Sequence, residues 1–138
     1  MWVTTTLGFF SVVRAYESDD VMIRSRVKKD LDALLDRFSV SRSGISFTPG
    51  NDYGYRVVVP IEVWSCWIAE LALDIDYPNF KDAVKQKNPL RAKTYMHVWS
   101  DYHQIENEES TLRPLKQRAR QEKMKNAKTD PRLVPRKR

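Results

Sequence analysis

The stretch that decides the fold reads Val21-Met-Ile-Arg-Ser-Arg-Val27, followed by Lys28-Lys-Asp-Leu-Asp-Ala-Leu-Leu-Asp-Arg-Phe38. In its first part, apolar and polar residues alternate, which is the period of a strand with one buried face. In its second part, apolar residues recur at helical spacing and form a single stripe. The sequence therefore predicts a strand over 21–27 and a helix over 28–38 that share one core.

The flanking segments extend this pattern into a domain. The apolar segment 2–14 reads as one long strand that forms a hairpin with 21–27. Downstream, the pattern predicts two more strands, over 45–47 and 53–59. It also predicts three helices, over 61–75, 80–87 and 91–106. This order predicts an α+β fold in which a four-stranded antiparallel sheet carries two helices on one face. Further helices follow, and the order ββαββα is a circular permutation of the ferredoxin-like arrangement.

Charge is unevenly distributed along the chain, which has 138 residues and a formal net charge of +6. Residues 111–138 contain eleven Lys or Arg and two acidic residues, a net charge of +9. Residues 1–110 contain thirteen Lys or Arg and sixteen acidic residues, a net charge of −3. Apolar periodicity also ends after Glu109. We therefore expect a mildly acidic domain over 1–110 and a basic tail over 111–138 that is flexible or ordered on a partner.

The composition limits the possible chemistry. Cys66 is the one cysteine of the sequence, which excludes an internal disulfide, and we expect a buried, inert thiol in a cytoplasmic protein. No apolar run approaches the roughly 20 residues of a membrane-spanning helix, so we expect no membrane partner. His97 and His103 point to different faces of a helix and predict no zinc pair. We expect no cofactor, no metal ion and a binding protein rather than an enzyme.

Basic and aromatic side chains are predicted to meet on the sheet face that the helices leave open. The candidate binding residues there are Arg24, Arg26, Tyr53, Tyr55 and Arg56. Such a face suits single-stranded RNA, because rings stack on bases and guanidinium groups hold phosphates. In the alternative, the arginines are solvated or paired with acidic residues, while the aromatic rings pack beneath the third long helix. For the aromatic residues we favour this alternative.

A second candidate lies where the helix predicted over 61–75 ends, in Asp76-Tyr-Pro-Asn-Phe-Lys81. Asn79 and Lys81 stand at the start of the next helix and offer hydrogen-bond donors to an anionic group. The alternative, which we favour, is that Asn79 caps this helix.

The tail provides the third set of candidates, because basic side chains bind phosphates with an affinity that falls steeply with salt. The residues concerned are Arg113, Lys116, Arg118, Arg120, Lys123 and Lys125.

Five blocks of the sequence carry a resemblance to a known group of proteins. They are Leu7-Gly-Phe-Phe-Ser-Val-Val13, Ile23-Arg-Ser-Arg26 with Asp30-Leu31, Asp52-Tyr-Gly-Tyr-Arg56, Ile75-Asp-Tyr-Pro-Asn-Phe-Lys81 and Tyr95-Met-His-Val-Trp99. Together they resemble a family of small bacterial and phage-encoded proteins of unassigned function. The resemblance spans residues 1–102 and leaves out the tail. It implies a compact domain of bacterial or phage origin and brings no activity with it.

These observations favour a non-enzymatic protein that binds nucleic acid, in the form of RNA or a nucleoprotein. The alternative is a protein-interaction module, such as an inhibitor or an accessory subunit of a bacterial or phage complex. A third hypothesis is a metal-independent ribonuclease, in which His97 or His103 acts as general base while Lys or Arg holds the phosphate.

Overall fold

The computed structural model describes the backbone of residues 1–16 and 18–129. It describes the side chains of that range except those of 107–113, 115, 116, 119 and 125–129. The chain divides into two compact units, the first from Met1 to Lys87 and the second starting at Asn88. The boundary predicted from the charge distribution, after residue 110, lies inside the second unit.

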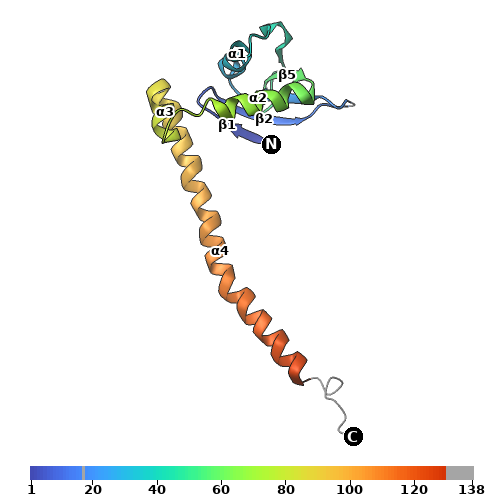
Figure 1. Cartoon of the computed structure of the whole chain (residues 1–138), viewed down its shortest axis with the longest axis vertical. Coiled ribbons are helices and arrows are strands. Elements are labelled where there is room, and N and C mark those ends of the chain that lie inside the picture. Colours follow the sequence, from blue (N-terminus) through green and yellow to red (C-terminus); the bar gives the residue numbers. More distant parts are fainter. Residues whose placement is uncertain (17, 130–138) are drawn as a thin grey trace. The chain divides into compact units, whose positions relative to one another are not determined.

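The first unit is built on a five-stranded antiparallel sheet with the strand order β1-β2-β3-β5-β4. The strands are β1 (Trp2–Thr4), β2 (Phe9–Arg14), β3 (Val21–Ser25), β4 (Ser46–Phe47) and β5 (Tyr55–Val59). This sheet, together with the helices, confirms the predicted α+β class (Figure 1).

The predicted strand count of four is wrong, because the segment 2–14 forms two strands instead of one. A turn separates β1 from β2, and the hydroxyl of Thr5 holds it. Thr5 Oγ1 accepts hydrogen bonds from the backbone N–H groups of Leu7 and Gly8 at 3.1 and 3.2 Å. The chain therefore reverses at a point where side-chain hydrogen bonding competes with the strand ladder.

The helices of the first unit pack where the periodicity predicted. α1 (Lys28–Arg37) buries Leu31, Leu34 and Leu35, and α2 (Ile61–Leu73) buries Trp64 and Trp67. These side chains join one core with strand residues of a single sheet face, namely Phe10, Val12, Val21, Ile23, Val57 and Val59. Both helices thus cover the same face, which confirms that prediction. Figure 1 shows α1 and α2 beside the strands.

The remaining elements follow without further strands in the described range. A 3₁₀ turn, η1 (Arg42–Gly44), precedes β4, and α3 (Phe80–Lys87) ends the first unit. Cys66 corrects the prediction of a buried thiol: it is exposed, because α2 directs its two tryptophans, not its cysteine, into the core.

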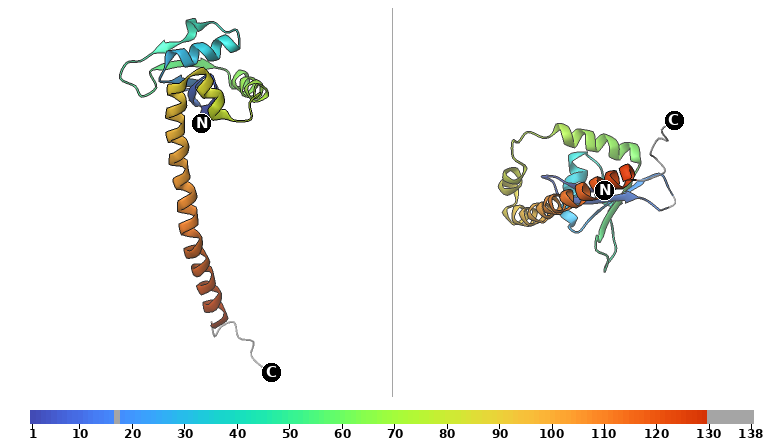
Figure 2. Two further views of the ribbon diagram at one scale, coloured as in Figure 1. Left: turned by 90° about the vertical axis from the view of Figure 1, so that its left-hand side faces the viewer. Right: turned by 90° about the horizontal axis from the view of Figure 1, so that it is seen from below.

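The second unit consists of one helix, α4 (Pro89–Thr129), in the range that the structure describes. The predicted end at residue 106 is wrong, since the helix continues through Pro114 to Thr129. Figure 2 shows this helix as one uninterrupted element. Residues 130–138 of the predicted tail lie outside the described residues. Among the described helices, none is long and apolar enough to cross a membrane.

Candidate functional site

A row of five residues crosses the whole sheet on the face opposite the core. Trp2 pairs with Ser11, Ser11 with Arg24, Arg24 with Arg56, and Arg56 with Ser46. Directly opposed residues of neighbouring strands project from the same face of a sheet. We call this set the arginine row. It places one aromatic ring, two hydroxyl groups and two guanidinium groups in line.

Arg24 occupies the centre of the row and is only partly accessible to water. Its Nη2 donates a hydrogen bond to Ser11 Oγ at 2.7 Å. Its Nε is buried and donates to no acceptor in the described part of the protein. None of the ion pairs formed among described residues involves Arg24. A partly desolvated cation without a carboxylate is unfavourable and attracts an anion.

Arg56, the neighbour of Arg24 on β5, is bound through uncharged groups. Its Nε donates to the carbonyl oxygen of Tyr53 at 3.2 Å, and its Nη1 donates to Thr48 Oγ1 at 3.2 Å. No carboxylate of the described residues pairs with it either. Like charges directly opposite each other on paired strands are destabilising. An anion placed between the two guanidinium groups would remove this repulsion.

Arg26 differs from the two arginines of the row because it has a carboxylate partner. Its Nε and Nη2 donate to Asp52 Oδ1 at 2.9 and 2.7 Å, and Nη2 also donates to Oδ2 at 2.8 Å. These hydrogen bonds raise the pKa of the Arg26 guanidinium. The charge of Arg26 is therefore largely balanced within the protein. This agrees with the alternative interpretation, in which the arginines are solvated or paired with acidic residues.

The aromatic residues divide into supporting and exposed rings. The ring of Tyr53 is 8% exposed, and the guanidinium carbons of Arg24 and Arg26 lie 5.1 and 4.3 Å from its centroid. Phe9 lies 6.3 Å from Tyr53 and 5.7 Å from Trp2, centroid to centroid. Trp2 is 65% exposed. The accessible stacking surface is therefore Trp2, while Tyr53 supports the two cations from below.

Tyr55 does not belong to this face. It pairs with Ser25 and packs against the core on the helix-covered side, with its ring 4.7 Å from that of Phe47. Strand alternation separates it from Arg56, its neighbour in sequence.

Asn79 forms the cap of α3, as the favoured alternative predicted. Its Oδ1 accepts hydrogen bonds from the backbone N–H groups of Lys81 and Asp82 at 2.9 and 3.4 Å. The ring of Tyr77 lies 6.0 Å from that of Phe80 and closes the loop over the cap. Local helix capping thus accounts for this motif, and Asn79 and Lys81 do not join the arginine row.

Three of the candidate tail residues, Arg118, Arg120 and Lys123, are exposed on α4. The side chains of the other three lie outside the described residues, and these are Arg113, Lys116 and Lys125.

The histidines do not assemble a site with each other. His103 stacks edge-on against Trp99 at 4.3 Å and lies 3.4 Å from Glu106. Within the described range, no three His, Cys, Asp or Glu residues gather closely enough to hold a metal ion.

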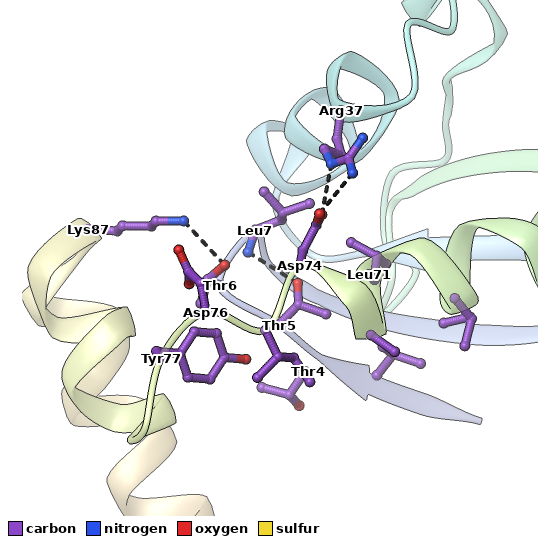
Figure 3. A pocket seen from close by; sticks show the side chains of 14 residues that line it. Thr4, Thr5, Thr6, Leu7, Arg37, Leu71, Asp74, Asp76, Tyr77 and Lys87 are labelled. Atoms are coloured by element: carbon purple, nitrogen blue, oxygen red, sulfur yellow. Dashed lines mark hydrogen bonds and ion pairs between the residues drawn. The ribbon is translucent and has the colours of Figure 1, made fainter.

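A cavity of about 500 Å³ opens elsewhere in the first unit, between the β1–β2 turn and the end of α2 (Figure 3). On one side, Lys87 Nζ donates to Thr6 Oγ1 at 3.3 Å. On the other, Arg37 Nε and Nη2 donate to the two carboxylate oxygens of Asp74 at 2.7 and 2.8 Å. The Arg37 hydrogen bonds lower the pKa of Asp74.

The charges around this cavity balance, since Arg37 and Lys87 face Asp74 and Asp76. A balanced lining favours no single charged ligand, which sets the cavity apart from the arginine row. The cavity was not predicted, because its wall includes the turn between β1 and β2, which periodicity assigned to a strand. The one signal in the sequence was Gly8, which follows Thr4-Thr-Thr-Leu7, because glycine is typical of a turn.

Comparison with known proteins adds no relative to this description. No family model matches the chain, and no similar curated protein or solved structure is found. The resemblance to bacterial and phage proteins therefore stays a prediction that rests on the quoted blocks.

Proposed function

We propose that the protein binds single-stranded nucleic acid, with RNA as the first candidate, on the sheet face that carries the arginine row. One observation carries the proposal: Arg24 and Arg56 face each other across paired strands without a carboxylate partner among the described residues. A phosphate group supplies the missing negative charge and accepts charge-assisted hydrogen bonds from both guanidinium groups.

The remaining members of the row suit the same ligand. The hydroxyl groups of Ser11 and Ser46 lie on either side of the two arginines. The exposed ring of Trp2 provides a stacking surface for a base at one edge of the sheet. At about 4.8 Å per strand, the row is about 19 Å long. This length accommodates a short single-stranded segment that runs across the strands.

The exposed basic residues of α4 contribute in a different way. Arg118, Arg120 and Lys123 have no fixed geometry in common with the row, so they add affinity of the non-specific, salt-dependent kind. Preference for one ligand over another then depends on the sheet face.

The test is a binding titration with a fluorescently labelled oligouridine, performed on the full chain at several salt concentrations. Arg24→Gln and Arg56→Gln each remove one phosphate contact. Each is expected to weaken binding about tenfold. Each is also expected to reduce the slope of log affinity against log salt by about 0.7.

Arg42→Gln is the matched control, because it removes the same charge from a guanidinium that is already paired with Asp36. It is expected to leave binding close to that of the unaltered protein. Equal affinity for all three variants would exclude the arginine row as the binding site. Circular dichroism checks that each variant remains folded.

A finer description of the fold also belongs to this proposal. A permuted ferredoxin-like domain has the sheet order β2-β3-β5-β4 and has helices at the chain positions of α1 and α2. The first unit matches this pattern, with β1 added at one edge of the sheet. Sheets of this kind with one open face recur among RNA-binding domains. That parallel supports the proposal by analogy alone.

A second candidate function, a protein-interaction module, is favoured by a separate observation. Several apolar side chains of α2 and its end are exposed, including Val63, Leu73 and Ile75. An inhibitor or accessory subunit that used them would bind its partner in a manner insensitive to salt and to nuclease. A pull-down with and without nuclease distinguishes the two candidates.

A further inference from the structure

We propose that two copies of this chain pair through the first half of α4, with their helices antiparallel and crossing near Ser100. This inference is independent of the proposed nucleic-acid binding, because it involves a different unit of the chain and none of the arginine-row residues.

One face of α4 carries a stripe of apolar residues. Tyr95, Val98, Trp99, Tyr102 and Ile105 recur at spacings of three and four, so they share one face of the helix. The last four are each between 45% and 56% exposed. Adjacent exposed aromatic and aliphatic side chains of this extent are typical of an interaction surface.

The charges at the two ends of the stripe favour a second copy of this chain as the partner. Arg91 stands at its start and Glu106 at its end, both on the face of the stripe, and Glu106 leads into an acidic stretch at 106–109. A parallel pair would bring like charges level with each other at both ends. An antiparallel pair brings the basic start of one copy level with the acidic end of the other.

The same arrangement matches the apolar residues. When two helices cross antiparallel at Ser100, Tyr95 comes level with Ile105 of the second copy, and Val98 with Tyr102. At the two-fold axis, Trp99 of one copy lies next to Trp99 of the other. Such an interface is self-complementary, as two-fold dimers require.

The size of the surface sets the expected strength. Residues 91–109 span about 28 Å at 1.5 Å per residue. A single pair of helices of this length buries less area than a standard stable interface. The dimer is therefore expected to dissociate in the micromolar range and to depend on protein concentration.

The first test measures the mass of the full chain by sedimentation velocity over a range of concentrations. The unaltered protein is expected to shift from monomer to dimer. The double variant Val98→Asp/Ile105→Asp is expected to weaken the dimer at least about tenfold. Gln104→Asp, a change at an exposed position on the opposite side of the helix, is the control and is expected to leave dimerisation unchanged.

The orientation is tested with charge variants that leave the stripe intact. Glu106→Lys places a new cation against the basic start of the other copy and is expected to weaken the dimer. Adding Arg91→Glu to it is expected to restore dimerisation, because the opposite charges meet again with their signs exchanged.

Each outcome decides the proposal. A monomer at every concentration would overturn it, and so would a dimer that the Val98→Asp/Ile105→Asp variant leaves intact. A dimer indifferent to Glu106→Lys would overturn the antiparallel arrangement, because only that arrangement brings residue 106 close to Arg91 of the other copy. Helical content measured by circular dichroism accompanies each variant.

Discussion

Asp30 is buried, and its carboxylate ties the first turn of α1 to the start of β2. Its Oδ2 accepts a hydrogen bond from the backbone N–H of Phe9 at 3.0 Å and lies 3.5 Å from Ser25 Oγ. The backbone at Gly8 must pass close to this side chain. A Cβ at Gly8 would lie 2.6 Å from Asp30 Cβ. The glycine is therefore required by a close approach and not by an unusual dihedral angle.

This close approach leads to a stability prediction. Gly8→Ala is expected to lower the free energy of unfolding by about 1–3 kcal/mol, because Asp30 or the turn must move to accept the methyl group. Urea denaturation measures the change. Gly44→Ala is the control, since a Cβ there would meet Val57 at an ordinary 3.7 Å. Equal midpoints for the two variants would contradict the account of Gly8.

Individual members of the site were predictable from sequence to different degrees. Alternation in 21–27 assigned Arg24 to the open face, and Arg56 was named among its neighbours. Their direct opposition depends on the register between β3 and β5, which no local pattern encodes. Trp2 and Ser11 were missed because the segment 2–14 was predicted to form one long strand, whereas a turn divides it into β1 and β2.

Helices α1 and α2 are joined at one end by Arg37, which reaches both Asp74 and Glu70. Its hydrogen bonds to Asp74 are bidentate, and its Nη1 lies 3.6 Å from Glu70 Oε2. The contact connects residues that are far apart in sequence, so it fixes how the two helices lie on the sheet. Through these hydrogen bonds, the Asp74 carboxylate raises the pKa of Arg37 and the Arg37 guanidinium lowers the pKa of Asp74.

The lowered pKa of Asp74 predicts a pH dependence. A carboxylate whose pKa is depressed by folding stabilises the protein above its unfolded pKa, and this contribution is lost as pH falls through the folded value. Arg37→Gln is therefore expected to be less stable than the unaltered protein at neutral pH. The difference is expected to vanish in acid, below the ordinary aspartate pKa.

Urea midpoints measured from pH 7 to pH 2 check this expectation. Asp74→Asn provides the second arm, and its difference from the unaltered protein should vanish over the same pH interval. A deficit of Arg37→Gln that persists at the lowest pH would show that the arginine acts through packing and not through its ion pair.

The elements show what periodicity can predict and where it fails. It predicted β3, α1, β5 and α2 because each presents one face to the core, whereas turn and helix-breaking residues marked the bounds of β4 and α3. It failed between β1 and β2, where a threonine hydroxyl and the distant Asp30 determine the turn. It also failed at the end of α4, where the side chains that the structure describes between 114 and 124 are exposed and give no apolar stripe.

The chain combines an acidic part with a basic helix end, and this division separates two sources of affinity. The sheet face offers two cations at a fixed separation, whereas the basic residues of α4 offer charge alone. Attraction of the second kind is uniform among nucleic acids and is suppressed by salt. Nucleic acid is therefore expected to contact the sheet and not only the helix.

Photo-cross-linking of a 4-thiouridine-substituted oligouridine to the full chain, followed by identification of the modified peptides, tests this claim most directly. Cross-links are expected in β1 and β2, around Trp2, and in β3 and β5, around Arg24 and Arg56. Raising the salt concentration should remove cross-links to α4 before those to the sheet. Cross-links confined to α4 would contradict the account.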